Sequence, residues 1–139
     1  MPMSRRRLSA LERARLIAEI VATYCSARWW LSSATFPEAV AAARDVPGPE
    51  RPPEGEIELR SAGLRLGRAV ERTLRALPVD SRCLVTALVL TRMLARRGIG
   101  TTFVLGVRTT PRFAAHAWVE HNGVALLSTT SDFQRLTEL

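Results

Sequence analysis

Two side chains in this sequence have the types needed for nucleophilic catalysis: a cysteine where a helix is predicted to begin, and a histidine in a predicted strand. Cys83 falls in the first turn of a helix expected from about residue 82 to residue 97. Unpaired backbone N–H groups and the positive end of the helix dipole lie at such a position, and both favour a thiolate. Arg82 adds a positive charge beside it. Cys83 is therefore the candidate nucleophile.

The candidate base lies in residues 114–120, where alternation of residue types predicts a strand. His116, Trp118 and Glu120 share one face of this strand, and alanines on both sides of His116 leave room for a helix terminus. A histidine beside a thiolate stabilises it and then protonates a leaving amine. Cys83 and His116 thus predict attack on a carbonyl carbon, with the backbone N–H of Cys83 as one oxyanion donor.

The remaining cysteine and histidine show no such pattern. Cys25 lies in the middle of a predicted helix on an apolar stripe, so we expect it to be a buried structural thiol. His121 falls at a predicted turn and is expected to be exposed to solvent. Two cysteines without a CxxC spacing, together with only two histidines, give no zinc signature. We therefore expect no metal and no cofactor.

Helices fill the first two thirds of the chain and strands follow. Capping boxes at Ser9-Glu12 and Thr35-Glu38 begin the first two helices, and Gly98 ends the fourth. The expected helices end near residues 31, 44, 76 and 97, and the expected strands are 101–108, 114–120 and 124–128. In the first helix, the stripe expected to face the core consists of Leu11, Ala14, Ala18, Val21, Ala22 and Cys25, with Ile17, Ile20 and Tyr24 beside it.

This order predicts an α+β fold, in which a buried helix carrying Cys83 packs on a small antiparallel sheet. The fourth helix is apolar almost all round, which is typical of a helix covered on several sides. Residues 46–55 hold four prolines and two glycines and are expected to form a linker. We therefore divide the chain into a helical region, residues 1–59, and a core, residues 60–139. Residues 121–123 are expected to form a three-residue hairpin loop.

Four segments, taken in order, resemble the transglutaminase-like leader peptidases of lasso-peptide biosynthesis. They are residues 81–84 (SRCL), 94–98 (LARRG), 104–108 (VLGVR) and 115–120 (AHAWVE). The resemblance implies a papain-like core and a cysteine peptidase that removes the leader from a ribosomally made precursor peptide. It also implies two partners, a leader-binding recognition protein and an ATP-dependent macrolactam cyclase. We expect residues 1–45, with Trp29 and Trp30, to contact the leader or the leader-binding protein.

The same resemblance places Cys83 and His116 at the nucleophile and base positions, but the third residue departs from the family pattern. Relatives often carry an aspartate soon after the hairpin glycine, whereas this chain has no carboxylate there until Asp132. Asp132 is the expected third catalytic residue if the chain turns back after Ser128. Ser128 itself, or a backbone carbonyl, is the alternative partner of His116.

Composition narrows the class of protein. The 139 residues carry a net charge of +7, and all 20 basic residues are arginines. Residues 60–112 hold 11 of these arginines and only two acidic residues. We interpret the excess arginines as side chains on the solvated faces of helices, and an acidic peptide partner is the second interpretation. We do not expect nucleic-acid binding. No membrane span or signal peptide is recognisable, so we expect a soluble cytoplasmic protein. The competing functions are a transglutaminase-type acyl transferase and a non-catalytic peptide-binding module.

Overall fold

The chain forms four helices and a four-stranded sheet in the computed structural model, which describes residues 7–48, 55–78, 83–129 and 133–139. The elements are α1 (Ala10–Ser33), α2 (Phe36–Arg44), α3 (Glu56–Ala76), α4 (Cys83–Arg96), β1 (Thr102–Arg108), β2 (Ala114–His121), β3 (Val124–Ala125) and β4 (Gln134–Glu138). The fold is α+β, as predicted, and both predicted capping boxes form. No helix among the described residues is long and apolar enough to span a bilayer.

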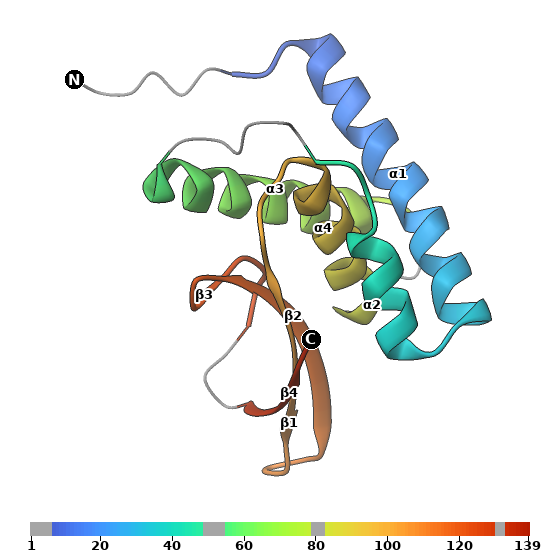
Figure 1. Cartoon of the computed structure of the whole chain (residues 1–139), viewed down its shortest axis with the longest axis vertical. Helices are drawn as coiled ribbons and strands as arrows, with labels where there is room; N and C mark the ends of the chain where they lie inside the picture. The colour runs from blue at the N-terminus through green and yellow to red at the C-terminus, as the bar shows by residue number, and fades with distance from the viewer. Residues whose placement is uncertain (1–6, 49–54, 79–82, 130–132) are drawn as a thin grey trace.

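Helix α4 is the centre of the core. Figure 1 shows it between the other three helices and the sheet, and it contacts α1, α2, α3 and β2. Every residue from Val85 to Thr91 is buried, as the continuous apolar run predicted. Gly98 ends the helix with φ 71°, the left-handed backbone that glycine adopts without strain. A central helix held on several sides fixes the position of its first residue, Cys83.

The sheet has the order β3-β2-β1-β4, and all its pairs are antiparallel. The predicted three-residue loop at residues 121–123 is wrong, because His121 pairs with Val124. The loop therefore has two residues, Asn122 and Gly123, with φ of 47° and 80°. Positive φ at both positions is what a two-residue type I′ turn requires, and Asn-Gly is its strongest sequence signal.

Two further features of the sheet differ from the prediction. The strand expected at residues 124–128 ends at Ala125, although the Leu126 N–H still donates to the Val119 carbonyl of β2 at 2.8 Å. Strand β4 was not predicted, because its sequence QRLTE lies exposed at the sheet edge and has no apolar alternation. Arg135 of β4 donates two hydrogen bonds to the buried Glu120 carboxylate, at 2.7 and 3.0 Å.

His121 is buried rather than exposed, which corrects the prediction for this residue. Only 6% of it is exposed. Its Nδ1 lies 2.7 Å from the Gly100 carbonyl oxygen, and its Nε2 lies 3.1 Å from Glu56 at the start of α3. A carbonyl oxygen and a carboxylate oxygen only accept hydrogen bonds, so the ring contacts an acceptor on each side. His121 therefore fastens the end of β2 to α3, away from the cysteine.

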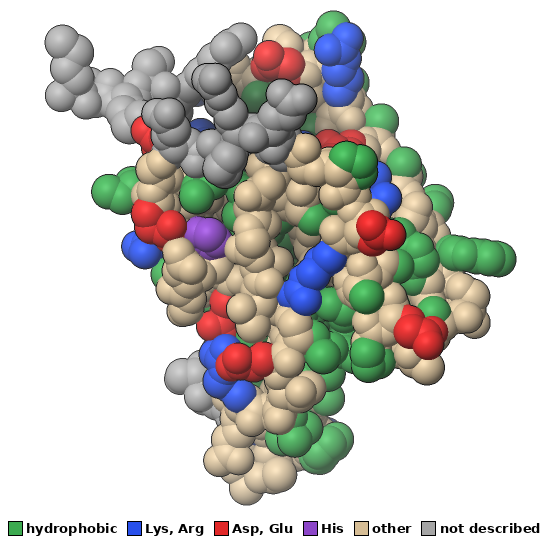
Figure 2. Space-filling model, viewed as in Figure 1, with side chains coloured by type: hydrophobic (Ala, Val, Ile, Leu, Met, Phe, Trp, Pro, Cys, Tyr) green, Lys and Arg blue, Asp and Glu red, His purple; other side chains and the backbone are tan. Residues whose placement is uncertain are grey.

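The stripe of α1 expected to face the core faces solvent instead. Leu11, Val21 and Cys25 are exposed, whereas Ile20 and Ala27 are fully buried. Figure 2 shows hydrophobic side chains gathered along the edge of the molecule that α1 forms. Periodicity could not separate the two faces, because α1 is apolar on both. We call the exposed set the outer α1 face: Leu11, Ile17, Val21, Cys25 and Trp29.

Glu19 joins α1 to the end of α4, and its replacement is expected to weaken the fold. The hydrogen bond from Arg97 lowers the pKa of Glu19, although partial burial opposes this. A lowered folded pKa means that the stabilisation is present above 4.5 and is lost as pH falls through the lower folded value. We expect Glu19→Gln to cost about 1 kcal/mol at pH 7, limited by solvent screening.

Urea unfolding of both proteins at pH 7 and at pH 4 measures this effect. The difference in free energy of unfolding between wild type and Glu19→Gln should shrink at the lower pH. An equal difference at both values would show that the Glu19 charge contributes nothing.

Candidate active site

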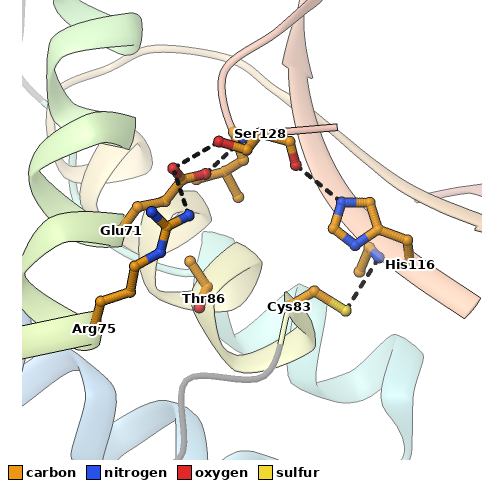
Figure 3. Close-up of a pocket in the computed structure, with 8 residues that line it drawn as sticks. Glu71, Arg75, Cys83, Thr86, His116 and Ser128 are labelled. Atoms are coloured by element: carbon orange, nitrogen blue, oxygen red, sulfur yellow. Dashed lines mark hydrogen bonds and ion pairs between the residues drawn. The ribbon is translucent and has the colours of Figure 1, made fainter. Parts of the chain in front are cut away.

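Cys83 and His116 open on the same pocket, which has a volume of about 170 Å³. Four segments build it, as Figure 3 shows: α3, the first turn of α4, β2, and the chain that follows β3. The lining residues are Glu71, Arg75, Cys83, Thr86, His116, Ala117, Leu127 and Ser128. The structure thus brings the two residues with predicted chemistry together from positions 33 apart in the sequence.

Cys83 is the first residue of α4 and is partly exposed to the pocket. The backbone N–H of Ala117 donates a hydrogen bond to its Sγ at 3.4 Å. A donor on sulfur favours negative charge there, as does the helix terminus. The pairing of β3 with β2 involves only Glu120 and His121. The edge of β2 near Ala117 is therefore not covered by β3, and Cys83 approaches it there.

His116 has one ring nitrogen held by the protein and the other facing the cysteine side of the pocket. Its Nε2 lies 3.0 Å from the backbone carbonyl oxygen of Ser128. A carbonyl oxygen only accepts, so Nε2 carries the proton and the lone pair of the neutral ring is on Nδ1. Figure 3 shows the ring between Ser128 and Cys83. Trp118 and Phe133 pack on it, with ring centroids at 5.7 and 5.2 Å.

Glu71 holds the segment that carries this carbonyl. The Ser128 backbone N–H and hydroxyl donate to its two carboxylate oxygens, at 2.6 and 2.9 Å. Arg75, one turn further along α3, lies 3.7 Å from the same carboxylate. The Glu71 carboxylate thus holds Ser128 in place, and the Ser128 carbonyl in turn holds the imidazole ring of His116. Sequence reasoning missed Glu71, although it is the one acid between residues 60 and 79.

The third residue predicted from sequence, Asp132, lies outside the described residues, as does Arg82. The described partner of His116 is the backbone carbonyl of Ser128, one of the two alternatives to Asp132. Glu120 shares the face of His116 but is bound to the Trp118 indole N–H at 3.0 Å and to Arg135.

Gly67 lets the segment after β3 lie directly on α3. A Cβ at this position would be 2.0 Å from the Leu126 carbonyl oxygen, a backbone atom that cannot move without moving its neighbours. We expect Gly67→Ala to push residues 126–128 away from α3, costing about 2 kcal/mol of stability despite the better helix propensity of alanine. The Ser128 carbonyl would then move from His116, and activity should fall with stability.

Gly63→Ala is the matched control. The added Cβ would meet only the flexible Leu126 side chain, at 3.0 Å, so it should be milder. Thermal unfolding of both variants compares them. Equal melting temperatures for the two variants would contradict a backbone clash at Gly67.

A cysteine at a helix start, a histidine on the adjoining strand and a shared pocket define a candidate site for thiol-dependent acyl chemistry on an α+β fold. The model of the transglutaminase-like superfamily matches residues 21–139. The chain therefore belongs to the transglutaminase-like superfamily, which includes cysteine peptidases and acyltransferases. No curated protein and no solved structure matches the chain.

The two free thiols offer an internal comparison of reactivity. Cys83 has a helix start and the Ala117 N–H beside it, whereas the exposed Cys25 lies mid-helix with neither. We expect brief treatment with iodoacetamide to alkylate Cys83 about tenfold more than Cys25, because only Cys83 has these donors beside its sulfur. Peptide mass mapping after brief labelling measures the ratio. Equal alkylation of the two cysteines would remove the argument for an activated thiol at Cys83.

Proposed function

We propose that this protein is a cysteine peptidase that removes the leader from a ribosomally made lasso precursor peptide. The observation that carries the proposal is the pocket in which Cys83, at a helix start, faces a His116 whose far nitrogen is held by Ser128. The resemblance of residues 81–84 and 115–120 to leader peptidases gives the substrate class. Asp132 is kept as a proposed further partner of His116.

The chemistry follows from these positions. Nδ1 of His116 takes the thiol proton, and the Cys83 sulfur attacks the scissile carbonyl carbon. The backbone N–H of Cys83 is the proposed donor to the oxyanion. Collapse of the intermediate breaks the C–N bond, and His116 returns the proton to the leaving amine. The leader is then held as a thioester on Cys83, and water attacks the thioester to release it.

The outer α1 face is the proposed contact for the leader-binding protein. It presents large apolar side chains to solvent, among them Trp29 with 68% of its surface exposed. Its neighbour Trp30 packs against Arg92 instead, with the guanidinium 5.4 Å from the ring centroid. The macrolactam cyclase is the proposed next enzyme, and its need for ATP suggests that the reaction takes place in the cytoplasm.

The test is a mass measurement on a lasso precursor incubated with this chain and the leader-binding protein. Hydrolysis releases two fragments whose masses sum to the precursor plus one water. An acyl transferase would instead join an amine with loss of about 17 Da, the mass of ammonia. An unchanged precursor under these conditions would favour the non-catalytic module.

A further inference from the structure

The pocket that contains Cys83 continues into a second groove along α3. Glu71 and Arg75 line both, and the other described residues that line the second groove are Arg68, Arg72 and Ala76. Because they share these two side chains, the two hollows lie side by side. A peptide bound with its scissile bond at Cys83 therefore has a path along α3.

Three arginines give this groove its charge. Arg68, Arg72 and Arg75 are spaced at i, i+4 and i+7, which sets them on one face of the helix. All three are exposed. Within the described part of the chain, no ion pair involves Arg68 or Arg72, and Arg75 has only the 3.7 Å contact with Glu71. Glu71 keeps its negative charge when the neutral Ser128 groups bind it, but three arginines outnumber this one carboxylate, so the groove is positive.

Other arginines between residues 60 and 112 bind groups of neighbouring helices and so stabilise the fold. Arg96 and Arg97 bind Glu19, and Arg92 donates to the carbonyls of Ala42 and Asp45. The arginines of the groove thus differ from those that hold the helices together.

We propose that this groove binds an acidic segment of the substrate peptide beside the scissile bond, so that the charge of that segment selects substrates. The inference rests on the proposed peptidase function. From Arg68 to Arg75 the helix rises about 10 Å, the length of about three residues of extended peptide. Guanidinium groups bind carboxylates with two parallel hydrogen bonds. The groove therefore fits two or three acidic side chains in close succession.

The experiment measures binding and cleavage separately. Two fluorescein-labelled dodecapeptides, differing only in three adjacent Glu replaced by Gln, are titrated with the Cys83→Ala protein, which binds without cleaving. We expect the acidic peptide to bind about tenfold more tightly at low salt, and the preference to shrink at high salt. The Arg68→Glu/Arg72→Glu variant should lose or reverse the preference. The control Arg60→Glu/Arg112→Glu makes the same charge change at exposed sites outside the groove and should keep it.

Equal affinity for the two peptides, or equal loss of preference in both double variants, would overturn the inference. A single-stranded oligonucleotide that binds as tightly as the acidic peptide, and depends on Arg68 and Arg72, would overturn it in favour of a nucleic-acid site. If the protein prefers the acidic peptide but does not cleave the precursor, only the proposed function is contradicted. If Arg68→Glu/Arg72→Glu cleaves precursors with and without acidic residues as fast as wild type does, only this inference is contradicted.

Discussion

Replacing Cys83 by Ala is expected to abolish precursor cleavage, and replacing His116 by Ala to reduce it by at least about 10³-fold. Cys83 supplies the only atom proposed to bond to the substrate, so no other group replaces it. Without His116 the leaving amine has no proposed proton donor. Rates of leader release, measured by chromatography under single-turnover conditions, separate these losses from changes in product release.

Cys25→Ala is the matched control for the first variant. It removes a sulfur from the outer α1 face, away from the pocket, and should leave the rate of leader release unchanged when the leader-binding protein is in excess. Circular dichroism and thermal unfolding establish that the variants are folded. A folded Cys83→Ala protein that still cleaves the precursor would show that the thiol is not the nucleophile.

The second large effect concerns Glu71 and Ser128, which hold the His116 ring in place. Glu71→Ala removes both acceptors that hold Ser128, so its carbonyl loses its fixed position beside Nε2. We expect turnover to fall about 10²-fold, with KM changing less, because the loss is of orientation during reaction. Ser128→Ala keeps the carbonyl and one bond to Glu71, so it should cost under about tenfold. Asp132→Ala should cost roughly 10–10³-fold if that carboxylate also orients the ring.

Glu71→Gln provides the check on mechanism. Its amide oxygen still accepts from Ser128, so it should retain more activity than Glu71→Ala. The pH profile of kcat should shift in the Ala variant, since the partner of the imidazolium has moved. A silent Glu71→Ala together with an inactive Asp132→Ala would mean that the aspartate, and not the Ser128 carbonyl, orients His116.

The helices and the location of the site could be predicted from the sequence because their signals are local. Both capping boxes and the apolar run of α4 depend on residues within one or two turns, and they form as predicted. The position of Cys83 at a helix start and of His116 on a strand follows from the same signals.

The parts that could not be predicted depend on residues distant in sequence. Glu71 and Ser128 are 57 positions apart, and no local pattern links a carboxylate on one element to a carbonyl on another. Gly67 is needed only because Leu126 crosses the helix there. Helix α1 has two apolar faces, so the choice between them was made by packing against α4. The error at residues 121–123 was different, because the Asn-Gly turn was visible in the sequence.

The most direct measurement of the central claim is the mass of the intact protein after rapid acid quenching during precursor cleavage. A thioester at Cys83 predicts that the protein gains the mass of the leader acyl group, on the proteolytic fragment that contains Cys83 and not on the one with Cys25. The Cys83→Ala protein should gain nothing. Leader release by a protein that never carries this adduct, and that Cys83→Ala performs equally well, would contradict the account.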